Sequence, residues 1–196
     1  MLLYVHNSIT SSLCTELDSF KNESIWCRMS AGTGRDSDDI HIGVVYNSPN
    51  ADISEINEMF SVIRFVSGRQ VLVMGDFNYP DIDWDCLESD SVGESFLNLV
   101  QDCFLFQHVL TPTRGNNILD LVLSSEEGMV EDLQVCEHLA NSDHNMTSFK
   151  LVCSTIISDT SRIVYDFNKG NYVKMNDMLN AVDWDIVLTG QEVIKM

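Results

Sequence analysis

The sequence predicts an α/β layered sandwich with mixed sheets, and three observations support this fold class. Apolar runs of strand length alternate with stretches that carry a helical stripe, which is typical of layered α/β folds. Several strand candidates also follow one another without a helix between them, which favours mixed sheets over a doubly wound parallel sheet. The chain has 196 residues, enough for one domain with a sizeable core.

The expected strands are short apolar runs separated by turn and loop residues. The longest polar interruption, AGTGRDSDD over 31–39, is expected to be a loop. In chain order the expected strands are 2–6, 24–30, 40–46, 71–74, 118–123, 133–136 and 146–152.

Two helices are expected in the main domain. Residues 53–66 carry apolar side chains at helical spacing, and Asp52 or Ser54 could cap this helix. A second helix is expected over 93–106. The pattern weakens from about residue 155, so the sequence predicts one domain over 1–155 and a linker or tail over 156–196, with a further helix at about 170–181.

The net charge and the cysteine content argue against several classes of protein function. Thirty acidic and eleven basic side chains give a formal net charge of −19, which argues against passive DNA or RNA binding through a basic face. An acidic metal site stays compatible with this charge. The six cysteines form no CxxC pair, and there is no signal peptide or apolar run near 18 residues. An intracellular protein with reduced thiols and no membrane span is expected.

The stretch VLVMGDFN over 71–78 places polar side chains directly after a buried strand. Gly75 interrupts the apolar run and permits a turn or a close backbone approach. Residues two apart in extended backbone point the same way, so Asp76 and Asn78 would project together from the strand end. A simple turn is the alternative interpretation of this stretch taken alone.

Three more polar clusters stand in or beside expected strands, and together they weaken the turn interpretation. Tyr46 ends the strand in GVVYNSPN, and Asp120 lies inside the apolar run ILDLVL. A carboxylate in such a run needs a partner, because unpaired burial is costly, and His144 in NSDHN is a natural one. Carboxylates, amide, tyrosine and histidine suit metal-dependent phosphodiester hydrolysis, with Asp143 beside His144.

The order of GVVYNSPN, VLVMGDFNYPDIDWD, TPTRGNNILDLVLS and NSDHNM resembles the endonuclease/exonuclease/phosphatase superfamily. More narrowly, the chain resembles the endonuclease domain of animal non-LTR retrotransposons. This resemblance implies a DNase I-like four-layer α/β sandwich and a monomeric, Mg²⁺- or Mn²⁺-dependent endonuclease that nicks target DNA in the nucleus or cytoplasm. The segment RIVYDFNKGNYVKMNDMLNAVDWD resembles the link to a reverse transcriptase, which would be a domain of the parent element.

The resemblance also implies roles for individual residues. Asp76 would activate the attacking water and, with Asp143, bind the metal; Asn78 and Tyr46 would contact the scissile phosphate. Asp120 would orient His144, which would stabilise the transition state. Asn47 falls in the substrate-binding stretch, where Asn47 and Ser48 replace the arginine and proline common in relatives.

The family pattern also includes an asparagine on a first strand and a metal-binding glutamate, and both precede the stretch that begins this sequence. Glu16 and Glu23 lie too late to replace that glutamate. We therefore expect a chain that lacks the N-terminal strands and is impaired in catalysis. A non-catalytic remnant or binding module of the same fold is the alternative, and a phosphoinositide or sphingolipid substrate is a third hypothesis that the C-terminal stretch disfavours.

Overall fold

The structure is a computed structural model that describes residues 1–17, 23–30, 39–152, 170–182 and 184. The chain divides into two compact units, Met1–Ile157 and Ser158–Met196. The first unit holds every strand of the described residues, and the second holds the helix α3 (Tyr172–Asn180). No helix in the described ranges is long and apolar enough to cross a membrane.

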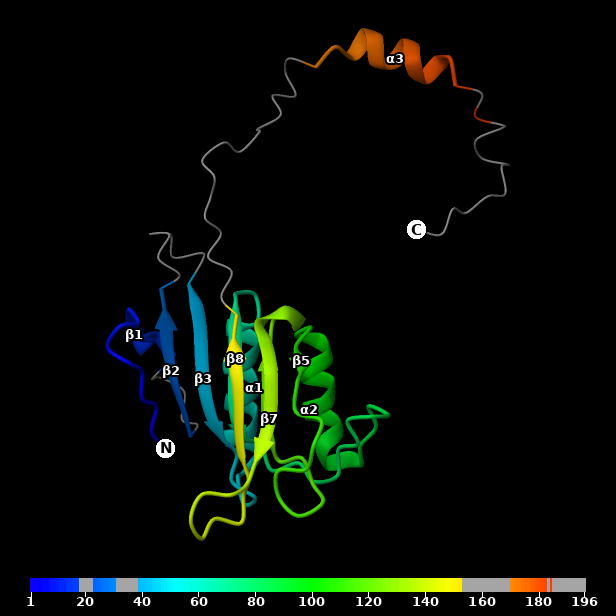
Figure 1. Ribbon diagram of the computed structural model, residues 1–196. Helices are drawn as coiled ribbons and strands as arrows, with labels where there is room; N and C mark the ends of the chain where they lie inside the picture. The colour runs from blue at the N-terminus through cyan, green and yellow to red at the C-terminus, as the bar shows by residue number, and fades with distance from the viewer. Residues whose placement is uncertain (18–22, 31–38, 153–169, 183, 185–196) are drawn as a thin grey trace. The chain divides into compact units, whose positions relative to one another are not determined.

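A mixed six-stranded sheet forms the centre of the first unit (Figure 1). Its strand order is β1-β2-β3-β4-β6-β5, in which β3 and β4 are parallel and the other neighbours are antiparallel. The strands are β1 (Ser11–Leu13), β2 (Ser24–Met29), β3 (Ile40–Tyr46), β4 (Val71–Asp76), β5 (Phe106–Gln107) and β6 (Asp120–Ser124).

Two helices, α1 (Ile53–Val66) and α2 (Ser91–Asp102), pack on one face of this sheet. Side chains from both helices share one hydrophobic cluster with alternate residues of β4 and β6, because successive strand residues point to opposite faces. Burying these apolar side chains is the main force that holds the helices on the sheet. Fully buried members of the cluster include Ile63, Val71, Val73, Phe96, Leu99 and Leu123.

A two-stranded antiparallel sheet covers the opposite face (Figure 1). Its strands are β7 (Val130–Cys136), which follows the short 3-10 helix η3 (Glu127–Met129), and β8 (Met146–Leu151). The intervening residues of β4 and β6, Leu72 and Val122, pack against this second sheet. The described residues therefore form three layers of the predicted four-layer sandwich: helices, the large sheet and the small sheet.

Most expected elements of the main domain are present. β3 and α1 have the predicted limits, and Asp52 caps α1 by accepting hydrogen bonds from the N–H groups of Ser54 and Glu55. Glu55 in turn accepts the N–H of Asp52, which completes a capping box. β4 extends two residues beyond the prediction, to Asp76, and the predicted loop over 31–39 lies outside the described residues except for Asp39.

The strand predicted over 2–6 is wrong, because these residues form no strand. Leu3 and Val5 still pack against the core while Leu2 and Tyr4 are exposed, so the alternation reflects burial without strand pairing. The edge strand is instead β1, which the polar residues of Ser11–Leu13 did not indicate. The helix predicted over 93–106 ends earlier, at Asp102, and Phe106 instead begins β5. The sequence pattern did not indicate the 3-10 helix η1 (Thr15–Leu17).

Candidate active site

Three predicted site residues lie side by side at one edge of the large sheet. In the strand register, Tyr46 of β3 is paired with Asp76 of β4, and Asp76 is paired with Asp120 of β6. β3 and β4 are parallel, so both end at this edge, and antiparallel β6 begins there. The edge therefore brings together polar side chains that are far apart in the sequence, with 30 positions from Tyr46 to Asp76 and 44 from Asp76 to Asp120.

Gly75 allows β4 to approach β3 closely just before the site. Its φ is +144°, and a Cβ atom built on it would lie 1.8 Å from the carbonyl oxygen of Val45. A residue with a side chain could not occupy this position without moving the backbone. The glycine that interrupts the strand pattern is thus required by the packing that sets Asp76 next to Tyr46.

His144 reaches the site from the loop between β7 and β8. Its Nδ1 atom lies 2.8 Å from Oδ2 of Asp120, so His144 is the partner that the sequence predicts for this buried acid. Its Nε2 atom lies 3.9 Å from Oδ2 of Asp76. All three side chains are at least three-quarters buried, so the imidazole is held between two carboxylates with limited access to water.

The surroundings of Asp76 disfavour its charged form. Burial raises the pKa of the Asp76 carboxyl above its usual value, and the nearby Asp120 carboxylate raises it further. His144 and the hydrogen bonds from Asn78 act in the opposite direction. A carboxyl group with a raised pKa, beside a histidine, is the type of group that general acid–base catalysis uses.

Asn78 and Asn47 fix the backbone on either side of the site. Asn78 has the left-handed φ of +52°, which asparagine tolerates, and its N–H donates to Oδ1 of Asp76 at 3.1 Å. Its Nδ2 donates to the carbonyl of Asn47, and Nδ2 of Asn47 donates to the carbonyl of Phe77, both at 2.8 Å. Asn47 is buried, so its amide braces the turn, and its predicted substrate contact stays a prediction.

Asp143 and Tyr46 lie at the solvent-exposed side of the site residues. The Asp143 carboxylate forms an ion pair with Arg114 at 2.6 Å, and the side chain is 68% exposed. The Arg114 guanidinium holds the pKa of that carboxyl below its usual range. Tyr46 is 39% exposed and is paired with Asp76 in the strand register. The roles predicted for both residues stay predictions.

Thr113 is a positioning residue that the sequence did not indicate. It is fully buried, and its Oγ1 accepts hydrogen bonds from the N–H groups of Leu119 and Asp120, both at 3.0 Å. Its carbonyl accepts the N–H of Asn145 at 2.8 Å. Thr113 therefore ties the start of β6 to the loop that carries His144. The only sequence signal would have been a small hydroxyl residue in an otherwise turn-like stretch.

The donor set at this edge fits a hard divalent cation that keeps most of its waters. Mg²⁺ is commonly bound through one or two carboxylates together with waters and substrate phosphates. Asp76 supplies a mostly buried carboxylate, and Asp143 offers an exposed one that is paired with Arg114. Among the described residues, three ligand atoms within 4.8 Å of one another occur in a different place, at Cys14, Glu16 and His41.

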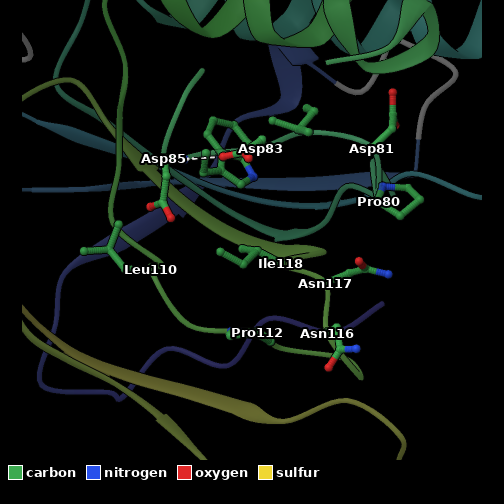
Figure 2. Close-up of a pocket in the computed structure, with 11 residues that line it drawn as sticks. Pro80, Asp81, Asp83, Asp85, Leu110, Pro112, Asn116, Asn117 and Ile118 are labelled. Atoms are coloured by element: carbon green, nitrogen blue, oxygen red, sulfur yellow. Dashed lines mark hydrogen bonds between the residues drawn. The ribbon is translucent and has the colours of Figure 1, made fainter. Parts of the chain in front are cut away.

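An open pocket of about 390 Å³ lies between the loop that follows the Asn78 turn and the loop that precedes β6 (Figure 2). Asp81, Asp83 and Asp85 line one side, and Asn116 and Asn117 line the other. Asp83 accepts a hydrogen bond from the N–H of Asp85, and Asp81 accepts one from the hydroxyl of Ser89. Two of the three carboxylates therefore have hydrogen-bond partners close by in the sequence. The carboxylates make this pocket a poor surface for a phosphate backbone.

Comparisons with known proteins agree with this architecture. A solved structure of the endonuclease domain of TRAS1, a telomere-specific non-LTR retrotransposon, matches with a TM-score of 0.58 and 18% identity, covering 74% of this chain and 70% of that chain. No curated protein sequence gives a significant match. The fold is therefore that of a DNase I-like endonuclease.

A family model described as endonuclease-reverse transcriptase matches residues 40–148, which is more than half of the chain. The protein belongs to this endonuclease-reverse transcriptase family. The matched region contains every residue of the candidate active site.

Proposed function

We propose that this domain is a DNA endonuclease that hydrolyses a phosphodiester bond and nicks its target, with Mg²⁺ or Mn²⁺ as cofactor. The observation that carries the proposal is the series Asp120–His144–Asp76, with separations of 2.8 and 3.9 Å at one sheet edge. Family membership supports the same function. A non-catalytic binding module would not require a histidine held between two mostly buried carboxylates.

Asp120 and His144 act on the phosphate. Asp120 accepts a hydrogen bond from Nδ1–H of His144, which orients the imidazole ring and directs Nε2 toward the reacting centre. A protonated Nε2 donates to a non-bridging oxygen, where negative charge develops in the transition state. Asp120 acts through His144 by holding the imidazole ring, so it is a positioning residue.

Asp76, Asn78 and Tyr46 act on the water and the substrate. The raised pKa of Asp76 improves its ability to accept a proton from the attacking water. Asn78 donates one amide hydrogen to the carbonyl of Asn47, and its side chain also hydrogen-bonds Asp76, so the amide is held beside the proposed position of the scissile phosphate. Tyr46 offers its hydroxyl from the rim.

Asp76 and Asp143 would hold the divalent cation, which supplies charge neutralisation at the phosphate when it is bound. Asp143 must break its ion pair with Arg114 before it can bind the cation. Among the described residues, no group of three closely spaced ligand atoms occurs at this site. The net charge of −19 also gives little attraction for DNA. We therefore propose that the 196-residue chain nicks DNA slowly in millimolar Mg²⁺.

A plasmid-relaxation assay tests the proposal. It compares the 196-residue chain with a chain extended at its N-terminus by a segment that carries the family's asparagine and glutamate. We expect barely detectable nicking by the first and clear metal-dependent nicking by the second. His144→Ala in the extended chain should abolish nicking, whereas the matched control His138→Ala, at an exposed histidine in the same loop, should not.

The outcomes separate the two parts of the proposal. A folded extended chain that fails to nick in either metal would contradict the endonuclease function. Robust nicking by the 196-residue chain that is lost in His144→Ala would support that function and contradict the weak cation site. A DNA substrate, a monomeric state, a location in the nucleus or cytoplasm and a reverse transcriptase domain in the parent element stay predictions.

A further inference from the structure

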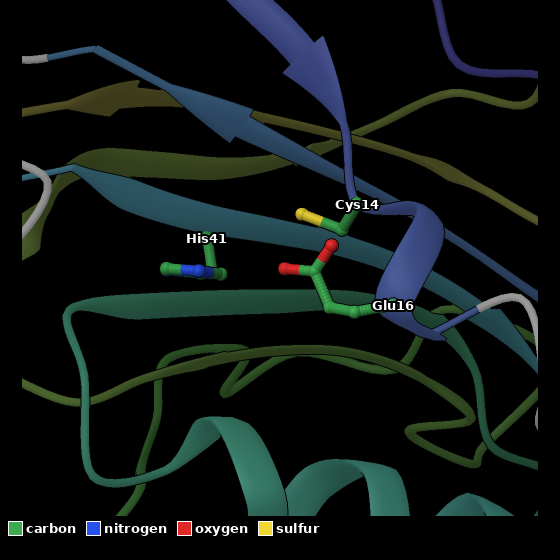
Figure 3. A group of neighbouring side chains, drawn as sticks. All are labelled: Cys14, Glu16 and His41. Atoms are coloured by element: carbon green, nitrogen blue, oxygen red, sulfur yellow. The ribbon is translucent and has the colours of Figure 1, made fainter.

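Cys14, Glu16 and His41 form a cluster of potential metal ligands away from the candidate active site (Figure 3). Cys14 follows β1, Glu16 lies in η1, and His41 is the second residue of β3. One ligand atom from each side chain lies within 4.8 Å of the other two. His41 is at the opposite end of β3 from Tyr46, so the strand itself separates this cluster from the site edge.

The imidazole of His41 supplies an independent sign of a missing partner. The residue is only 6% exposed, and its Nδ1 atom is buried without a hydrogen-bond partner. A buried polar nitrogen without a partner is rare, because it has lost its hydrogen bonds to water without replacement. Thiol and carboxyl groups beside it suggest that the absent partner is a cation that all three side chains share.

The chemistry of the three groups selects the cation. A thiolate is a soft ligand that Mg²⁺ and Ca²⁺ do not favour, while sulfur, imidazole nitrogen and carboxylate oxygen together suit Zn²⁺. One thiolate and one carboxylate also neutralise the two positive charges of the ion. Zinc needs ligand atoms closer together than 4.8 Å, and the exposed Glu16 side chain can move to supply the closer approach.

Neighbouring charges are compatible with a cation at this position. Arg28 is close to the cluster, but its guanidinium pairs with the mostly buried Asp39 at 3.5 Å. Arg69 is held to α1, where it donates to the carbonyl of Phe65 and lies over the Phe65 ring. Both positive charges thus have partners of their own.

We propose that Cys14, Glu16 and His41 bind one Zn²⁺ ion, with water in the remaining coordination position. The backbone already prepares two of the ligands, because Cys14 N–H donates to Trp26 and the carbonyl of Cys14 accepts the N–H of Leu17. The ion would link the β1–η1 segment at the edge of the large sheet to the central strand β3. Its role is therefore structural, separate from the hydrolytic cation.

The test uses the full chain with Asp76→Asn and Asp143→Asn, so that the candidate active site cannot bind the metal. Equilibrium dialysis with Zn²⁺ should give one ion per chain, and Co²⁺ in its place should give a thiolate-to-cobalt charge-transfer band. Glu16→Gln should weaken Zn²⁺ binding by at least about tenfold, and Cys14→Ser should remove the cobalt band. The matched controls Glu23→Gln and Cys86→Ser, at exposed positions outside the cluster, should bind as the parent does.

Thermal unfolding gives a second measurement. Zn²⁺ should raise the Tm of the parent and of both controls, because binding to the folded state alone is stabilising, but should raise that of Glu16→Gln much less. Glu16 is exposed, so its variant keeps the fold even if Cys14→Ser does not. A parent without a thiolate–cobalt band, or Zn²⁺ binding that Glu16→Gln leaves unchanged, would overturn the proposal.

Discussion

The two sheets contribute to the candidate active site in different ways. In the large sheet, β4 and β6 are covered on both faces, by helices on one side and by β7 and β8 on the other. In the small sheet, burial alternates along β8, and one face is open to solvent. The large sheet supplies Asp76 and Asp120 from its strands, whereas the small sheet supplies His144 from a loop.

This difference means that rigid strands hold the two carboxylates, whereas a loop holds the histidine. The carboxylates are fixed by strand register and by burial, so their separation depends on the packing of the core. The histidine depends on its hydrogen bond to Asp120 and on the contact between Asn145 and Thr113. Substitutions of apolar core residues in the large sheet should therefore reduce stability, while substitutions that break the Asp120–His144 contact should reduce activity with little loss of stability.

The largest effect on activity is expected from breaking the hydrogen bond between Asp120 and His144. Asp120→Asn removes the carboxylate that orients the His144 imidazole, so nicking by the extended chain should fall roughly 10²-fold or more. Asp132→Asn, at an exposed aspartate on β7, is the matched control and should retain full activity. Urea unfolding should show similar stability for both variants; equal nicking rates would contradict the role of Asp120.

Gly75→Ala tests the close packing of the large sheet. The added Cβ would meet the Val45 carbonyl at 1.8 Å, with φ at +144°, so the fold should lose roughly 3 kcal/mol or more. Gly128→Ala is the counterpart beside the small sheet, where a Cβ meets nothing within 4 Å. Its free energy of unfolding should stay within about 0.5 kcal/mol of the parent value. Equal losses in urea unfolding would show that the two regions do not differ in packing.

Leucine truncations compare the two sheets directly. Leu121→Ala, at 2% exposure in β6, should cost about 2–5 kcal/mol because it leaves a cavity between helices and sheet. Leu133→Ala, at a half-buried position in β7, should cost about 1 kcal/mol. Chemical denaturation of both variants measures the difference in the free energy of unfolding. A larger loss in Leu133→Ala would contradict the conclusion that the large sheet is the more rigid of the two.

The smallest expected effect is the pH-dependent stability of Asp76→Asn. Because the folded-state pKa of Asp76 is raised, protonation favours the fold, and this stabilisation is lost as pH rises through the folded pKa. Asparagine resembles the protonated acid and still accepts the Asn78 N–H. The variant should therefore be slightly more stable than the parent at pH 7, with the difference vanishing below about pH 4. Urea midpoints across this range check the sign, which a less stable variant at pH 7 would contradict.

Sequence patterns predicted the parts of the fold that local chemistry determines. The helix over 53–66 has its own cap in Asp52, and β3 is bounded by polar residues at both ends. The run over 2–6 has a strand-like pattern but remains unpaired, whereas Ser11–Leu13 has little pattern and pairs with β2. Pairing depends on which strand edge is available in the folded chain, and a local window does not contain that information.

The candidate site could be predicted where a polar residue interrupts an apolar run. Asp120 in ILDLVL indicated a buried acid that needs a partner, and the 2.8 Å contact with His144 supplies it. Thr113 gave no such signal, because its role rests on hydrogen bonds to two other segments. The cluster of Cys14 with His41 was also hidden, since the two residues are 27 apart and meet only when β2 and β3 pair.

The supply of His144 by a loop outside the large sheet has a consequence for the order of folding. β3, α1 and β4 are consecutive in the chain and can assemble through short connections, but the contact between Asp120 and His144 requires β7 and β8 to dock as well. Refolding chains should therefore regain helical circular dichroism before they regain nicking. A newly synthesised domain would therefore pass through a compact state in which the candidate active site is not yet assembled.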